Sequence, residues 1–161
     1  MYTNIMIAVD GSPESLQAVR EVLALVQRGL HVDIALVNVQ EPASLLQLAT
    51  QDSDAIAAAA VEAGEHLMAP GAALLDAAGV GYSMEVVLGE PSTTLVDMAE
   101  QLGADLVLLG VRGMGAIESV LVGSVSKAVI SRCSKPVMVV KLPEAVDSAP
   151  DTEEDILPEA G

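Results

Sequence analysis

The sequence is poor in aromatic residues. Its 161 residues include two Tyr but no Phe or Trp, whereas apolar residues as a whole make up 52%. A chain of this length and composition can bury one core of ordinary size, but it is short for two domains. We therefore expect a single globular domain with an aliphatic core.

Cysteine is also scarce, since Cys133 is the only one. A lone thiol allows neither an internal disulfide nor a thiolate zinc cluster, and no signal peptide is visible. His31 and His66 lack partners at metal-ligand spacing, so we expect no metal site. Apolar runs are interrupted well before the roughly 18 residues that a membrane helix needs. These absences favour a cytoplasmic protein that does not insert into a membrane.

Positive charge is scarce and unevenly distributed. Seven Lys and Arg stand against 23 Asp and Glu, a net charge of -16. We expect no binding to nucleic acid, because neutralising its phosphates requires clustered cations. Residues 106–143 nevertheless hold five bases and one acid, whereas residues 144–161 hold seven acids and no base. Residues 143–161 are therefore expected to form an acidic, disordered tail to a domain spanning residues 1–142.

Strand and helix patterns alternate along residues 1–142. The first apolar run, residues 4–9, ends at Asp10-Gly11-Ser12-Pro13, where Ser12 is placed to cap a helix that Pro13 begins. Gly29 ends that helix. Further strands are predicted at 31–39, 81–88, 105–109 and 136–142, and further helices at 54–78, 92–102 and 124–133. Pro70 predicts a kink or two successive helices in the long helical region.

Five apolar strands joined by helices predict an α/β fold, a three-layer sandwich around a doubly wound parallel sheet. Such sheets bind ligands beyond the carboxyl ends of the strands, where the strand order reverses. Here those ends are Asp10, Val39 and Gly110. On its own, Asp10 would only stabilise the turn after its strand. Its place at this edge of the sheet favours contact with a ligand.

A glycine-rich segment leads into the last predicted helix. Gly110 and Gly113 stand three residues apart, nine residues follow, and Gly123-Ser124-Val125-Ser126 comes where the helix begins. A helix start exposes unpaired N–H groups and the positive end of the helix dipole, which suits phosphate. Glycine also lets a ribose or phosphate approach the main chain. The sequence has no P-loop, and Gly113-Met114-Gly115 lacks the third glycine of a Rossmann motif.

This spacing resembles the nucleotide signature of the universal stress protein family over roughly residues 1–142. Val9-Asp10-Gly11-Ser12 after the first strand and Lys135-Pro136-Val137 at the last strand add to the resemblance. It implies the strand order 3-2-1-4-5, a role in stress response or signalling, and a homodimer paired through Val137–Val140. It also implies an adenine nucleotide as ligand, ATP or else ADP or AMP, with or without Mg²⁺.

The resemblance also implies roles for individual residues. Asp10 would contact the ribose or adenosine side, Val39 would meet adenine through its backbone, and Gly110 would lie near the ribose. The phosphates would be held by Gly113, Gly123, Ser124, Val125 and Ser126. The candidate set is completed by Ala8, Val9, Leu109 and Arg112. Arg112 and Lys127 are each as consistent with a solvated face as with a phosphate contact.

Three functions stay open at this point. The preferred one is a regulatory module in which bound nucleotide biases loop order, dimer geometry or partner choice. A slow Mg²⁺-dependent ATPase or phosphotransferase could use the same site, but Glu118 is the only acid within the glycine-rich segment and no general base is evident. The third is a dimeric scaffold with an incidental nucleotide motif, since the last strand is too apolar to stay an exposed edge.

Overall fold

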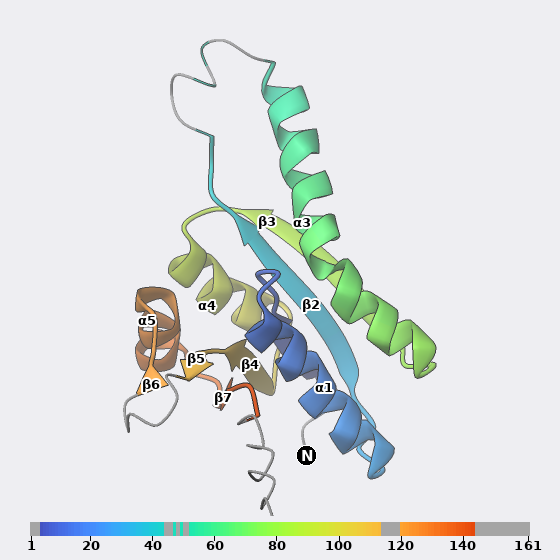
Figure 1. Cartoon of the computed structure of the whole chain (residues 1–161). Helices are drawn as coiled ribbons and strands as arrows, with labels where there is room; N and C mark the ends of the chain where they lie inside the picture. Colours follow the sequence, from blue (N-terminus) through green and yellow to red (C-terminus); the bar gives the residue numbers. More distant parts are fainter. Residues whose placement is uncertain (1–3, 44–46, 48, 50–51, 114–119, 144–161) are drawn as a thin grey trace, which may run out of the picture.

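The computed structural model describes residues 4–43, 47, 49, 52–113 and 120–143. Five parallel strands form one sheet in the order β3-β2-β1-β4-β7 (Figure 1). Their bounds are β1 Asn4–Ala8, β2 Asp33–Gln40, β3 Tyr82–Leu88, β4 Leu106–Gly110 and β7 Val137–Val140. Counted along the chain, these are the third, second, first, fourth and fifth strands of the sheet, so the predicted strand order is confirmed.

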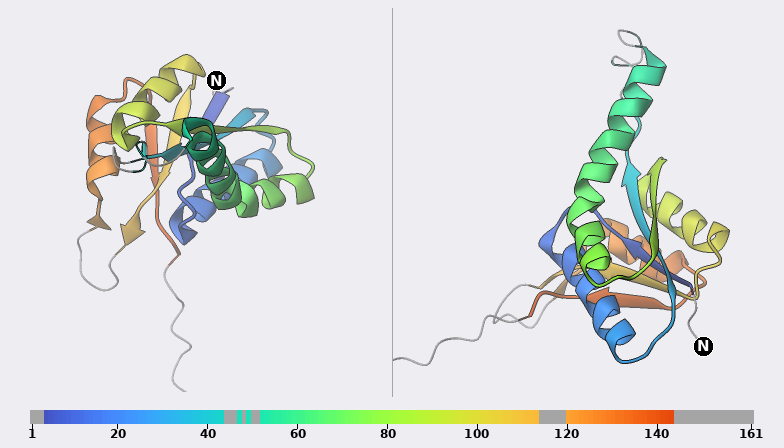
Figure 2. Two further views of the ribbon diagram at one scale, coloured as in Figure 1. Left: turned by 90° about the horizontal axis from the view of Figure 1, so that it is seen from above. Right: turned by 90° about the vertical axis from the view of Figure 1, so that its right-hand side faces the viewer.

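Helices cover both faces of the sheet (Figure 2), and the described residues place two on each face. They are α1 Pro13–Gln27 and α3 Ser53–Ala77 on one face, and α4 Pro91–Gln101 and α5 Ser124–Arg132 on the other. Strand β1 separates the two cores, because Ile5 and Ile7 pack with α1 and α3 while Met6 packs with α4 and α5. All buried apolar side chains of the described residues are aliphatic or Met, as the composition predicts.

The turn from β1 into α1 forms as the sequence predicts. Ser12 caps the helix, its Oγ accepting a hydrogen bond from the backbone N of Ser15 at 3.1 Å, and Pro13 is the first helical residue. Gly11 has a φ of +82°, a conformation that other residues rarely adopt. At the far end the chain leaves α1 through Gly29, whose φ is +99°. The start and the end of α1 are thus determined by residues next to them in the sequence.

Helix α3 continues through Pro70. The sequence predicted either a kink or two successive helices there, and one 25-residue helix forms instead of two. Pro70 itself is exposed, whereas Met68, Gly71 and Ala72 beside it are buried against the sheet and α1. Burial of these neighbours offsets the backbone hydrogen bond that proline cannot make.

The glycine-rich segment contains a small element that was not predicted. Its two ends form a two-stranded antiparallel pair, β5 Arg112–Gly113 with β6 Val120–Leu121. The pair brings the chain back from the end of β4 to the start of α5. The residues between them, 114–119, lie outside the described part of the chain, as do residues 144–161 of the expected tail. Within the described residues, none of the helices combines the length and apolarity that crossing a membrane requires.

Candidate functional site

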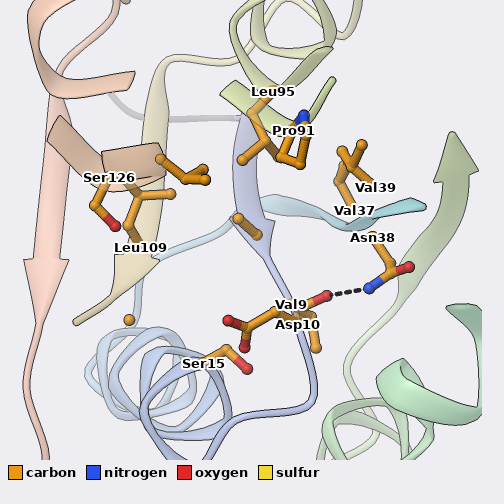
Figure 3. A pocket seen from close by; sticks show the side chains of 13 residues that line it. Val9, Asp10, Ser15, Val37, Asn38, Val39, Pro91, Leu95, Leu109 and Ser126 are labelled. Carbon is orange, nitrogen blue, oxygen red and sulfur yellow. Dashed lines mark hydrogen bonds between the residues drawn. The ribbon is translucent and has the colours of Figure 1, made fainter. Parts of the chain in front are cut away.

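A pocket of about 250 Å³ opens at the carboxyl ends of β1, β2 and β4 (Figure 3). The strand ends form its base, and the first turns of three helices form its sides. From the strands come Ala8, Val9, Asp10, Val37, Asn38, Val39, Leu109 and Gly110. From the helices come Ser15 of α1, Pro91 and Leu95 of α4, and Val125 and Ser126 of α5. The pocket lies where the strand order reverses, as expected for a doubly wound sheet.

A wider, more open groove adjoins the pocket and has a volume of about 700 Å³. Four residues line both hollows, so that one continues into the other: Asp10, Gly110, Val125 and Ser126. The groove follows the start of α5 and is completed by Glu14, Val111, Arg112, Val122, Gly123 and Ser124. It is mixed in charge, since Asp10 and Glu14 face it together with Arg112.

The structure brings together nearly all the residues singled out from the sequence. Ala8, Val9, Val39 and Leu109 lie in the pocket, and Arg112, Gly123 and Ser124 lie in the groove, beside the four shared residues. The backbone of Gly113 pairs with Val120 in the β5–β6 hairpin, directly after Arg112 of the groove. Residues singled out by their spacing in the sequence thus lie together in the fold, around these two hollows.

The start of α5 differs from the other helix starts that the structure describes. The side chains of Ser12, Asp52 and Glu90 cap α1, α3 and α4, respectively, and accept hydrogen bonds from their first turns. At α5 the capping residue is Gly123, which has no side chain to do so. A Cβ added at Gly123 would have no neighbouring atom within 4 Å. The first-turn N–H groups of α5 thus lack a side-chain cap beside open space.

Asp10 has a local role that the sequence already indicated. Its Oδ1 accepts a hydrogen bond from the backbone N of Ser12 at 2.9 Å, which stabilises the turn into α1. The same side chain is exposed and belongs to the lining of the pocket (Figure 3) and also to that of the groove. One carboxylate oxygen is therefore engaged in the turn, while the residue as a whole faces both hollows.

Gly110 is required by packing, a reason that the sequence did not reveal. We expected that a missing side chain here would let a ligand approach the backbone, and that expectation stays a prediction. In addition, a Cβ at Gly110 would lie 2.4 Å from the backbone C of Glu14 and from the backbone N of Ser15. Real Cβ atoms essentially never come so close, so the end of β4 can pack against the first turn of α1 only without a side chain. Glycine at this position is required by packing.

Asn38 was not among the predicted site residues, yet it is a buried polar residue of the pocket. It is 3% exposed, and its Nδ2 donates to the carbonyl O of Val9 at 2.7 Å (Figure 3). Its Oδ1 accepts from Nε2 of Gln40, also at 2.7 Å. The bond to Val9 joins the ends of β1 and β2 beyond their paired residues, and the two bonds together satisfy the buried amide. The signal was a polar residue between Val37 and Val39 in an apolar strand.

The wall formed by α4 was not predicted to belong to the site. Pro91 and Leu95 line the pocket, and Glu90 just before them caps the helix. Oε2 of Glu90 accepts from the backbone N of Thr93 at 2.8 Å, and Oε1 accepts from the backbone N of Ser92 at 3.2 Å. The Thr93 N–H, followed by the Ser92 hydroxyl, lowers the pKa of Glu90 to about 2. Gly89-Glu90-Pro91-Ser92 after a strand was the signal for this wall.

No group of three or more His, Cys, Asp or Glu side chains able to hold a metal ion occurs among the described residues. Cys133 is partly buried and packs in the core beneath α4 and α5. The chemistry that the site offers is consequently that of an apolar pocket with backbone N–H groups, hydroxyls, two carboxylates and one guanidinium at its open side.

Known proteins share this fold and sequence pattern. Universal stress protein MJ0531 of Methanocaldococcus jannaschii is 28% identical over 145 residues, which cover 89% of this chain and 85% of the relative. The solved structure of MJ0577 from the same organism matches with a TM-score of 0.71 and 25% identity, over 90% of this chain and 99% of that one. A universal stress protein family structure from Arabidopsis thaliana, At3g01520 with AMP bound, matches with a TM-score of 0.63 and 21% identity, over 93% and 97% of the two chains.

The sequence model of the universal stress protein family matches residues 1–141, almost the whole described part of the chain. This match includes all the strands and helices that form the pocket and the groove. The chain belongs to the universal stress protein family.

Proposed function

We propose that this chain is a cytoplasmic binding module for an adenine nucleotide, ATP above all, and that the bound nucleotide regulates a stress response or a signal. Residues 1–142 form the binding domain and residues 143–161 a separate tail. One observation carries the proposal: the pocket runs directly into a groove at a helix start that no side chain caps. The pocket takes the nucleoside, and the groove takes the phosphates.

The nucleoside fits the pocket by size and chemistry. Its lining is mainly aliphatic, which suits the faces of a base, and the volume of about 250 Å³ is close to the lower limit of ordinary ligand pockets. The base lies against the main chain of Val39. The ribose connects base and phosphates, so it lies where both hollows meet, beside Asp10 and Gly110. The family structure solved with AMP supports an adenine nucleotide.

The phosphates are placed at the start of α5. There the N–H groups of Ser124, Val125 and Ser126 and the positive end of the helix dipole attract an anion. The two serine hydroxyls and Arg112 add donors at the groove. Gly113, which pairs with Val120 in the β5–β6 hairpin, completes the phosphate-binding set. The groove extends beyond the pocket, which favours ATP over AMP.

Mg²⁺ fits this arrangement as a partner of the nucleotide. Mg²⁺ is commonly held by one or two carboxylates together with substrate phosphates and water. Asp10 and Glu14 both line the groove and would supply those carboxylates. When bound, the cation would neutralise phosphate charge next to these two acids.

Glu14 also favours a second candidate function, slow hydrolysis of ATP. It is an acid in the groove that the sequence did not bring to the site, and a carboxylate there could orient a water molecule. We expect release of labelled phosphate from ATP to stay at background in the wild-type chain. Release that exceeds background and falls to it in Glu14→Gln would establish the ATPase instead.

Binding can be tested by thermal unfolding with and without nucleotide. ATP should raise the unfolding midpoint of the wild-type chain, because a ligand that binds only the folded state stabilises it. Gly123→Val should unfold cooperatively but lose the ATP effect, since its side chain would occupy the open space in front of the helix start. Gly81→Val is a matched control: Gly81 is also free of atoms within 4 Å of an added Cβ but lies outside the pocket and the groove. An unchanged wild-type midpoint, or an equal ATP effect in Gly123→Val, would contradict the proposal.

A homodimer through β7 is the second part of the proposal. This strand is an edge of the sheet, and Met138 and Val139 are each 38% exposed. Ile130 of α5 and Leu142 after the strand are exposed nearby in the sequence. Pairing with a second copy would cover an apolar edge that otherwise invites aggregation. Sedimentation equilibrium should show a dimer at micromolar concentration, and Val139→Lys should yield a monomer; a wild-type monomer would refute this interface.

A further inference from the structure

Two polar links join α4 to the chain of α5 and its following turn. In the first, Nη2 of Arg132 donates to Oγ of Ser92 at 2.6 Å, and this hydroxyl lies 2.9 and 2.8 Å from the two carboxylate oxygens of Glu90. In the second, Lys135 pairs with Glu100 at 3.8 Å, and the Ser134 hydroxyl bonds to the same carboxylate. We call them the Arg132 link and the Lys135 link.

The two links differ in their relation to the pocket. The Arg132 link reaches the first turn of α4, where Pro91 and Leu95 form one wall. Arg132 itself ends α5, whose first turn supplies Val125 and Ser126 to the adjoining wall. The Lys135 link reaches Glu100, at the opposite end of α4, where no residue lines the pocket. The Arg132 link therefore connects the α4 wall to the end of the helix whose first turn supplies the other wall, whereas the Lys135 link reaches neither wall.

The chemistry of the Arg132 link makes it a firm connection. Ser92 is 6% exposed, so its hydroxyl must find partners within the protein. It accepts from a guanidinium and donates to a carboxylate, two bonds to charged groups, which are stronger than neutral ones. The hydroxyl thus bridges opposite charges from two elements that are 40 residues apart in sequence. Loss of either bond would leave a nearly buried hydroxyl with fewer partners.

We propose that the Arg132 link sets the separation of the α4 and α5 walls and thereby the affinity of the pocket for the nucleoside. Arg132 is a positioning residue: it lines neither the pocket nor the groove and acts through Ser92 on the wall beside it. The inference rests on the proposed function, because it assumes that a nucleoside occupies the pocket. It assigns a role in ligand affinity to a residue outside the nucleotide signature.

The test compares Arg132→Met with Lys135→Met, using adenosine and ATP as ligands in titration calorimetry. Both variants lose one positive charge near the end of α5, so they are matched in their long-range effect on phosphates. Arg132→Met should weaken the binding of adenosine and of ATP by the same factor of about five. This is the effect expected when a hydrogen bond to a charged group is lost and acts on the ligand indirectly, through Ser92. Lys135→Met should change neither affinity by more than about twofold, as expected for an exposed ion pair. Adenosine carries no phosphate, so weaker adenosine binding cannot result from a lost attraction between the positive charge and phosphates.

Ser92→Ala is a second variant that breaks the Arg132 link, and it alters no charge. It should weaken adenosine binding in the same direction, and combining it with Arg132→Met should add little, because both changes break one link. Unchanged adenosine affinity in Arg132→Met, or equal weakening in Lys135→Met, would overturn the role of the link. Failure of the wild-type chain to bind either ligand would instead overturn the proposed function, and the role of the link with it.

Discussion

Helices α4 and α5 pack side by side on one face of the sheet, but their first turns are completed in opposite ways. At α4 the carboxylate of Glu90 accepts hydrogen bonds from the backbone N–H groups of Ser92 and Thr93. At α5 Gly123 offers no side chain, and a Cβ added there would meet no atom of the described residues within 4 Å. The same physical feature, a set of unpaired N–H groups at the positive end of a helix, is used by the protein in one helix and left accessible in the other.

This difference explains how one site can have two unlike halves. Because Glu90 fills the anion position of α4, that helix contributes only apolar wall to the pocket through Pro91 and Leu95. Because α5 has no such cap, its first turn is available to an anion from outside the chain. Adding a side-chain cap to α5 should therefore change ligand binding, whereas removing the cap of α4 should change stability.

The largest effect is expected when α5 is given the cap that α4 has. Gly123→Asp places a carboxylate where the phosphates are proposed to bind. Repulsion between this carboxylate and the phosphates should weaken ATP binding by about 100-fold or more. The folded state should not suffer, since Asp is at least as good an N-cap as Gly. Calorimetric titration with ATP measures the first effect, and urea unfolding measures the second.

Gly123→Asn is the control for charge, because it caps the helix with a neutral side chain. It should weaken ATP binding less than Gly123→Asp does. Equal ATP affinity in the wild-type chain and in Gly123→Asp would mean that phosphates do not bind at the start of α5.

A second prediction compares the stability effects of alanine at two glycines that line the groove, Gly110 and Gly123. Gly110→Ala should lower the free energy of unfolding by about 2–3 kcal/mol, because its Cβ would overlap the backbone of Glu14 and Ser15 at 2.4 Å. Gly123→Ala, which meets no atoms, should cost about 1 kcal/mol or less through the poorer cap. Urea unfolding of both variants measures the difference. Equal losses would mean that Gly110 is not held by packing against α1.

The sheet and its helices could be predicted from the sequence because their signals are local. Ser12-Pro13 marks the start of α1, and Gly103, with a φ of +59°, marks the end of α4. Pro70 does not divide α3 into two helices, because its local cost is offset by burial of neighbours that only the packed fold shows. The β5–β6 pairing was missed because two-residue strands carry no periodicity.

The site was predictable where a single segment forms it and not where distant segments meet. Gly123 to Ser126 stand at one helix start, so spacing was enough to find them. Gly110 was recognised, but the backbone of α1 that requires glycine there is almost 100 residues away in sequence. The contact of Arg132 with Ser92 likewise joins residues 40 apart, and neither residue belongs to a motif. Long-range contacts of this kind leave no pattern in one sequence.

The smallest predicted effect concerns the start of α4, which Glu90 caps. The stability that Glu90 contributes should be lost only at acidic pH. The pKa of Glu90 is lowered from 4.5 to about 2, first by the N–H of Thr93 and then by the hydroxyl of Ser92. A carboxyl group with a lowered pKa in the folded state stabilises that state fully above its unfolded value, and the contribution disappears as the pH falls through the folded value. The stabilisation by Glu90 should thus be complete above about pH 5 and decline from pH 4.5 towards pH 2.

Glu90→Gln isolates this contribution, because all other acids titrate alike in both proteins. The variant should be less stable than the wild-type chain at pH 7, and the difference between them should shrink as the pH is lowered below 4.5. Urea unfolding at a series of pH values measures it. A difference that stays constant down to pH 3 would show that the carboxylate of Glu90 gains nothing from the start of α4, and the contrast with α5 would then rest on Gly123 alone.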